Sequence, residues 1–403
     1  MTNIEIIPSG TVTSPEGFYA GAVAAGIKPG TKDKLDLGIL FSEAPCEAVA
    51  MFTTNRIKAA PVVLSQQRLQ SGRATAIVMN SGCANAFTGE QGMTDAAKMT
   101  ELAAKGIGIM PEDVLVASTG VIGHCLPMKR IQTKIDRIIL TRDGGRGLAK
   151  AIMTTDTVPK EVALKVRSAG GEFTIGGVAK GSGMIHPNLA TMLCVLSTDA
   201  RVGLGFLKRA LRKAVAVSFN MISVDGDTST NDMVLVMANG LAQNAIITKA
   251  PQGRAFQQAL DQVCIHLAKS IARDGEGATK LIEVTVNGAL SISDARIAAR
   301  TVVSSNLVKA AVYGSDPNWG RVVAALGRSG VEVVESKIGL YFGDVCLVRG
   351  GSPEPFDDKR ALAVLQGPEV SIRLELNLGR GSATAWGCDL TEKYVKINSE
   401  YLT

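Results

Sequence analysis

The chain has 403 residues, of which 46% are hydrophobic and 20% charged, and its net charge is +6. Such a length and composition indicate an ordinary globular protein of two or three lobes. The basic residues are dispersed and no aromatic side chains are interleaved with them, which argues against a nucleic-acid surface. No apolar run approaches the ~20 residues of a membrane span.

The seven cysteines are widely spaced and form no Cys-x-x-Cys pair. This pattern favours free thiols in a reducing compartment over a disulfide framework or a zinc site. The first residues contain no basic segment followed by an apolar one, so no signal peptide is expected. We therefore expect a cytoplasmic protein.

In the first half of the chain, short apolar runs alternate with amphipathic segments. Gly106 is the expected stop of one helix, and polar loops of small residues, 80–86 and 118–123, follow two of the strands. The pattern predicts strands at 38–41, 48–52, 76–79 and 114–117, and helices at 94–105, 129–141 and about 147–154.

The second half has longer helices. Ser293 or Asp294 is expected to cap a helix that runs toward Tyr313. Strands and helices interleave without a strict alternation, which indicates a mixed α/β architecture with more than one sheet layer. The other predicted elements are strands at 192–196, 233–238, 282–286 and 370–378, and helices at 204–217 and 253–273.

One stretch, 180–199, joins a glycine-rich loop to a buried strand, with Thr191 at the junction. A hydroxyl held at the mouth of a strand suits a nucleophile. Alternatively, Thr191 is simply the first residue of a strand, where threonine is common. The pattern alone leaves both interpretations open.

Several common kinds of site have no motif in this chain. No GxxxxGK[ST] phosphate loop and no HExxH zinc motif occurs. The three histidines, His124, His186 and His266, are scattered, so a Ser-His-Asp triad is poorly supported. An enzyme built on this chain would need a base other than histidine.

The segment 180–193, Lys-Gly-Ser-Gly-Met-Ile-His-Pro-Asn-Leu-Ala-Thr-Met-Leu, resembles the cleavage and nucleophile motif of the ornithine acetyltransferase (ArgJ) family of arginine biosynthesis. Further matching segments extend the resemblance from about residue 10 to Thr403. It implies an α/β helix–sheet–sheet–helix fold of the ornithine acetyltransferase and self-cleaving aminopeptidase type. It also implies cleavage between Ala190 and Thr191, giving an alpha chain, 1–190, and a beta chain, 191–403, that begins with the nucleophile.

Cleavage would supply the missing base. A free α-amine has an ordinary pKa of about 7.7–8.0, so that much of it is neutral near pH 8. Such an amine can accept the hydroxyl proton of the same threonine, whereas an amide nitrogen cannot. The motif therefore implies self-cleavage first and acyl transfer second.

The resemblance also assigns an oxyanion hole to Thr119 and Gly120, in Ser-Thr-Gly-Val-Ile-Gly. A hydroxyl next to a glycine N–H offers two donors at close range. By itself the tripeptide is a weak signal, for which a simple turn is the ordinary interpretation.

The substrate-binding positions follow residue by residue from the same resemblance. Thr155 adjoins one of them, so that the register there is open between Thr154 and Thr155. Glu276 would pair with the ornithine ammonium, although an acid after a helix is usually solvated, and a chain end is usually disordered. The matching positions are Thr154, Lys180, Thr191, Glu276, Asn398 and Thr403.

The implied activity is that of a glutamate N-acetyltransferase. It would carry acetyl from N2-acetylornithine to L-glutamate by a ping-pong mechanism, with acetyl-CoA as a second candidate donor and with no metal or bound cofactor. The implied assembly is a tetramer of two alpha and two beta chains, without nucleic-acid or membrane partners. Two alternatives are a related self-cleaving aminopeptidase or amidase, which would hydrolyse its ester with water, and a non-enzymatic binding protein with an inert Thr191.

Overall fold

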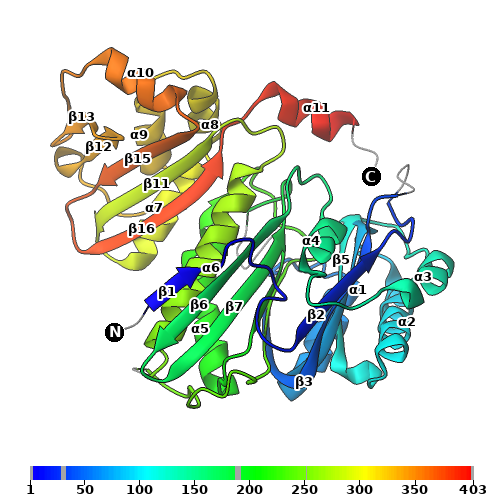
Figure 1. The fold of residues 1–403 in the computed structure, drawn as a ribbon. Helices are drawn as coiled ribbons and strands as arrows, with labels where there is room; N and C mark the ends of the chain where they lie inside the picture. Colours follow the sequence, from blue (N-terminus) through cyan, green and yellow to red (C-terminus); the bar gives the residue numbers. More distant parts are fainter. Residues whose placement is uncertain (1–2, 29–32, 187–191, 251, 401–403) are drawn as a thin grey trace.

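The computed structural model describes residues 3–28, 33–186, 192–250 and 252–400 (Figure 1). These residues form two β-sheets with helices packed against them. The larger sheet has nine strands, in the order β1-β6-β7-β8-β10-β3-β4-β5, and β2 pairs with β3. The bounds of its strands are β1 Asn3–Ile6, β2 Phe18–Val23, β3 Leu37–Phe52, β4 Arg73–Cys83, β5 Val114–Val121, β6 Lys160–Ser168, β7 Gly171–Lys180, β8 Leu193–Thr198 and β10 Met233–Ala238.

The larger sheet folds over on itself through the long strand β3. The pairing register of β3 with β4 shifts between Phe41 and Cys46, and the second half of β3 pairs with β10 instead. Successive side chains of a strand point to opposite faces of the sheet. In each strand, one set of alternate residues can therefore face the space between the two halves of the folded sheet, and the other set can face the covering helices. The helices that cover this sheet are α1 Ala60–Arg68, α2 Gly89–Ile107, α3 Met128–Lys134, α4 Gly145–Ile152, α5 Leu204–Val217 and α6 Arg254–Arg273.

The burial of alternate residues shows the layers. Val195 and Leu235 share an inner core with Ile77 and Leu115 from β4 and β5. The opposite faces of β8 and β10 pack with α5 and α6, and the opposite faces of β4 and β5 pack with α1, α2 and α3. The order is helix, sheet, sheet, helix, and the prediction of a mixed multilayer α/β fold is confirmed.

The smaller, seven-stranded sheet lies at one end of the molecule (Figure 1). Its strand order is β14-β13-β12-β15-β11-β16-β9. Helix α11 then leaves this sheet and runs back toward the larger lobe (Figure 1). The bounds are β9 Ile222–Ser223, β11 Leu281–Ala289, β12 Gly339–Phe342, β13 Val345–Arg349, β14 Ser352–Pro353, β15 Glu369–Glu375, β16 Gly381–Cys388, α7 Ile292–Val303, α8 Asn306–Tyr313, α9 Gly320–Gly327, α10 Asp358–Gln366 and α11 Glu392–Glu400.

Strands β8 and β10 come from beyond residue 191 but lie in the middle of the larger sheet. β8 pairs with β7 on one side, and β10 pairs with β3 on the other. Every residue of β8 and of β10 is buried. The segments before and after residue 191 therefore share one sheet and one core.

Four local predictions were wrong. The helix expected at 129–141 ends at Lys134, and residues 138–141 are not helical. Gly106 lies inside α2, and Gly108 ends this helix because its φ of +86° is the left-handed conformation that glycine tolerates. Ser291, and neither of the two expected residues, caps α7 by accepting from the N–H of Asp294. The expected helix toward Tyr313 is broken at residues 304–305 into α7 and α8.

None of the helices in the described part of the chain combines the length and the apolar character that crossing a membrane requires.

Candidate active site

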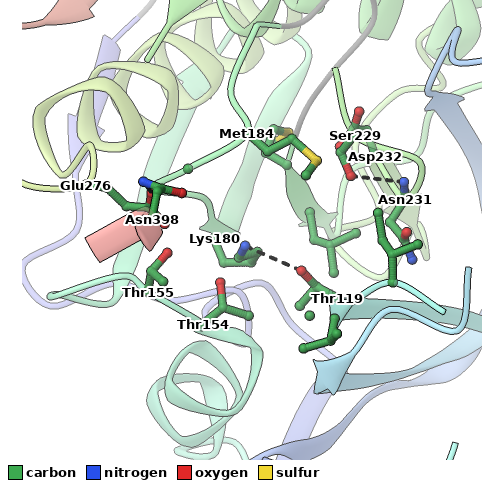
Figure 2. A pocket seen from close by; sticks show the side chains of 16 residues that line it. Thr119, Thr154, Thr155, Lys180, Met184, Ser229, Asn231, Asp232, Glu276 and Asn398 are labelled. Atoms are coloured by element: carbon green, nitrogen blue, oxygen red, sulfur yellow. Dashed lines mark hydrogen bonds between the residues drawn. The ribbon is translucent and has the colours of Figure 1, made fainter. Parts of the chain in front are cut away.

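A cavity of about 350 Å³ opens where the ends of several strands of the larger sheet meet the loop after α6 (Figure 2). It is bordered by the end of β5, the end of β7, the start of β8 and one residue of α11. The residues that line it are Thr119, Gly120, Val121, Ile122, Thr154, Thr155, Lys180, Gly183, Met184, Met192, Leu193, Ser229, Asn231, Asp232, Glu276 and Asn398.

Thr119 and Gly120 lie in strand β5, so a simple turn at this position is excluded. Gly120 has a φ of +132° and lies so close to the carbonyl carbon of Gly82 that a Cβ could not be accommodated. The Nζ of Lys180 is 3.4 Å from the Oγ1 of Thr119 and donates to it (dashed in Figure 2). Because the hydroxyl accepts from Lys180, its own proton is left to point elsewhere in the cavity.

Asn231 fixes the end of β5 from the other side of the cavity. Its Nδ2 donates to the carbonyl of Ala84 at 2.6 Å and to that of Ser118 at 2.9 Å. A buried amide that satisfies two strand-end carbonyls restricts their movement. Asn231 thereby helps to hold Thr119 and Gly120 in place.

A buried cluster of charged side chains interacts electrostatically with Lys180. Lys160 Nζ lies 2.6 Å from a carboxylate oxygen of Asp156 and 2.6 Å from one of Asp274. Burial opposes ionisation of Asp156, but Lys180, Lys160 and the N–H of Gly181 together hold its pKa well below the usual range. Burial lowers the pKa of Lys180, and Asp156 partly counters this effect. The Asp156 carboxylate therefore offsets part of the desolvation penalty on Lys180 at the cavity wall.

Glu276 is buried and does not behave as a solvated loop acid. Its N–H donates to the carbonyl of Ser182 at 2.9 Å. Asn398 of α11 donates through Nδ2 to its Oε2 at 2.8 Å. Gly183 lies directly against the carboxylate, where a Cβ would overlap with it. The glycine-rich loop and the C-terminal helix together orient this acid.

Both threonines of the uncertain register line the cavity. The N–H of Thr154 donates to Asp156 at 3.0 Å, which ties this turn to the buried network. Figure 2 shows Thr154 and Thr155 on the same wall as Lys180 and Glu276. The choice between the two threonines stays open.

Three predicted positions, Ala190, Thr191 and Thr403, lie outside the described residues. Met192, the first described residue after the proposed cleavage point, lines the cavity.

None of the three histidines is among the described residues that line the cavity. His186 contacts Ser223 Oγ through Nδ1 at 3.0 Å and Arg300 through Nε2 at 3.1 Å. Because a guanidinium only donates, Nε2 must accept, so that the proton of the neutral ring lies on Nδ1. His186 therefore fastens the loop to its neighbours.

Sequence reasoning did not assign roles to four residues around the cavity. Asp156 and Lys160 flank the predicted threonine cluster, and Asn231 and Asp232 end a polar loop just before a strand. For Lys160, Asn231 and Asp232 the position at the start of a strand was the available signal, whereas Asp156 lies in the turn between α4 and β6 and gave none.

Comparison with known proteins supports one family over almost the whole chain. The ArgJ family model matches residues 19–403. A relative from Symbiobacterium thermophilum, named arginine biosynthesis bifunctional protein ArgJ, is 56% identical over 398 residues, or 98% of this chain and 99% of its own. A protein of the same name from Dehalococcoides mccartyi is 51% identical over 403 residues, or 100% of both chains. The crystal structure of such a protein from Bacillus halodurans is 47% identical with a TM-score of 0.50, and covers 51% of this chain and 97% of that chain.

Proposed function

This chain belongs to the ArgJ family of ornithine acetyltransferases, and we propose that it moves acetyl from N2-acetylornithine to L-glutamate through an acetyl-threonine intermediate. It is an acyltransferase of arginine biosynthesis. We further propose the ping-pong order of the two half-reactions, the roles of the individual residues and the assembly.

The observation that carries the proposal is the convergence of separate segments on one cavity. Six residues that the family resemblance singles out come from five distant parts of the chain. All six line the cavity next to Met192: Thr119, Gly120, Thr154, Lys180, Glu276 and Asn398.

In the first half-reaction, Thr191 Oγ attacks the acetyl carbonyl of N2-acetylornithine. The free α-amine of Thr191 accepts the hydroxyl proton, as N-terminal threonine nucleophiles do. The Thr119 hydroxyl, oriented by Lys180, and the N–H of Gly120 donate to the oxyanion that develops. Ornithine then leaves, and the acetyl group stays on Thr191 as an ester.

Charge complementarity would position the donor. Glu276 pairs with the side-chain ammonium of the ornithine moiety, and Lys180 pairs with its carboxylate. Thr154 and Asn398 add polar contacts on the same wall, and Thr403 is proposed to do so from the end of the chain. In the second half-reaction the α-amine of glutamate attacks the ester, and N-acetylglutamate departs.

We further propose that the chain cuts itself between Ala190 and Thr191 and that the fragments, 1–190 and 191–403, stay together. The position of β8 and β10 in the middle of the larger sheet supports this, since separation would expose the core. The Bacillus halodurans match also supports it, because a solved chain of about half the length is expected for one fragment of a pair.

The remaining proposals rest on the family resemblance alone. They are acceptance of acetyl-CoA as a second donor, an assembly of two alpha and two beta chains, and chemistry without a metal or bound cofactor. A cytoplasmic location is proposed from the cysteine pattern.

Product analysis tests the function. Purified protein is incubated with N2-acetylornithine and glutamate, and N-acetylglutamate and acetate are quantified. N-acetylglutamate is the expected product, whereas acetate alone would refute transfer and favour the aminopeptidase or amidase alternative. A parallel incubation with acetyl-CoA and glutamate tests the second donor.

Self-cleavage is tested on a denaturing gel. Wild-type protein is expected as two bands, and Thr191→Ala as a single inactive chain near 42.1 kDa. Two bands and retained activity in Thr191→Ala would refute the assignment of the nucleophile.

A further inference from the structure

One buried acid at the cavity has no role in the scheme above. Asp232 ends the loop before β10 and is 2% exposed. It lines the cavity, and its Oδ2 has no hydrogen-bond partner among the described residues. A buried carboxyl oxygen without a partner is destabilising, so such an atom in a functional cavity requires an explanation.

The rest of Asp232 is held firmly. Its carbonyl accepts from the N–H of Thr53 at 3.0 Å, and the N–H of Met233 donates to the carbonyl of Met192 at 2.9 Å. The side chains of Ser229 and Thr53 and the N–H of Met192 also interact with the carboxyl. Figure 2 shows the side chain beside Ser229 and Asn231, on the wall away from Glu276. The carboxyl is therefore fixed in place with one oxygen still available.

The charge around Asp232 is sparse. Lys180, from β7, is the charged group that acts on it, whereas Thr53, Met192 and Thr119, from β3, β8 and β5, are uncharged. Burial raises the pKa of Asp232 well above its usual range, and Lys180 only partly opposes this. The carboxyl thus keeps its proton at pH values at which an exposed aspartate has lost it.

We propose that Asp232 is a further catalytic residue, whose Oδ2 exchanges a proton with the amine nitrogen that leaves or attacks at the acetyl carbon. This inference rests on the acetyl transfer proposed above. An acid that stays neutral in an apolar setting so that it can donate a hydrogen bond is an established catalytic arrangement.

The proton balance closes over one cycle. In the first half-reaction the C–N bond of acetylornithine breaks, Oδ2–H gives its proton to the leaving nitrogen, and Asp232 becomes a carboxylate. The α-amine of Thr191 meanwhile holds the proton from its own hydroxyl. In the second half-reaction a neutral glutamate amine forms the new C–N bond and gives one proton to the carboxylate of Asp232. The threonine ammonium returns its proton to Oγ as the ester bond breaks.

The test compares Asp232→Asn, which keeps the shape but cannot carry the proton, with a matched control, Asp199→Asn. Asp199 is also buried and has a raised pKa because of burial. However, it lies outside the residues that line the cavity, and its two oxygens accept from the N–H groups of Thr174 at 2.7 Å and Glu16 at 3.0 Å. A general acid contributes about 100-fold or more to a rate, so kcat/KM for N2-acetylornithine should fall by about this factor in Asp232→Asn only.

The pH profile separates proton transfer from a structural role. Because the protonated form acts in the first half-reaction, the wild-type rate should fall as the pH rises through the raised pKa of Asp232. This alkaline limb should vanish in Asp232→Asn, move to a different pH in Asp232→Glu, and stay as in the wild type in Asp199→Asn. Unchanged kinetics in Asp232→Asn, or a loss of rate with the alkaline limb intact, would overturn the proposal.

If the Asp232→Asn chain does not cleave itself, its transfer kinetics cannot be measured, and the Asp232→Glu variant provides the test. A cleaved Asp232→Glu with a displaced alkaline limb supports the proposal, and an uncut chain or a wild-type profile overturns it. If wild-type protein makes no N-acetylglutamate, the acetyl-transfer function fails instead, and the gel and product assays show this before any variant is measured.

Discussion

Replacing Gly183 with alanine should weaken the recognition of acetylornithine without disturbing the fold. The Cβ of an alanine here would overlap with the Glu276 carboxylate, and the backbone of Gly183 is not in the left-handed region. The perturbation is therefore steric and local. The carboxylate must move, and it would leave its 2.8 Å hydrogen bond with Asn398.

The size of the effect follows from the interactions that are lost. A hydrogen bond to a charged group contributes about 1.5–3 kcal/mol, and each 1.4 kcal/mol changes an equilibrium about tenfold. The displacement of Glu276 should therefore raise the KM for N2-acetylornithine by about 10- to 100-fold. Self-cleavage should survive, because neither Gly183 nor Glu276 supplies a group to the bond that breaks.

The assay is steady-state transfer at varied N2-acetylornithine and fixed, saturating glutamate. Gly327→Ala is the matched control, since a Cβ on this residue of α9 meets nothing within 4 Å. A Gly183→Ala enzyme with the wild-type KM for N2-acetylornithine would show that the carboxylate of Glu276 is not held where the ornithine ammonium binds.

Three further predictions concern other parts of the site. Glu276→Gln, which removes the negative charge, should raise the KM for N2-acetylornithine at least tenfold but not that for glutamate; an equal rise in both would contradict the ammonium pairing. Gly120→Ala should lower kcat by about 100-fold or more, because the residue loses a φ of +132° and its N–H leaves the oxyanion hole; a wild-type kcat would refute this. The pKa of Asp156 is lowered in the folded state, so its ionisation stabilises the fold above its ordinary pKa of about 3.9 and this contribution is lost as the pH falls. Urea unfolding of Asp156→Asn should therefore depend less on pH in the acid range than that of the wild type, and identical slopes would contradict the assignment.

The elements that the sequence predicted best are those whose signal is local. Helix α5 has the bounds expected from its apolar periodicity, 204–217, and β10 matches the continuous apolar run at 233–238. In contrast, β6 was not predicted, although Val162, Leu164 and Val166 alternate along it. The charged residues that flank these three dilute the apolar signal, and only pairing with β1 and β7 makes a strand of the segment.

In the candidate site, too, local motifs were predictable from the sequence, and contacts between distant segments were not. Short motifs located Thr119, Lys180 and Glu276 through their resemblance to a family, and the cavity brings all three together. The burial of Lys160 and Asp232 was not foreseeable, because both residue types are usually solvated. Their burial depends on contacts between segments more than 50 residues apart, such as that of Lys160 with Asp274.

An enzyme that takes acetyl from ornithine and gives it to glutamate has to accommodate two amino acids with opposite side-chain charges. Glu276 would attract the ornithine ammonium but repel the side-chain carboxylate of glutamate. Lys180 lines the same cavity, where Asp156 favours its charged form, and it can attract the carboxylate common to both. If both substrates use Lys180 and only ornithine uses Glu276, the glutamate side chain must point to another wall. Asn398 donates to Glu276 from α11, so that the C-terminal helix is the element that can separate the two binding modes.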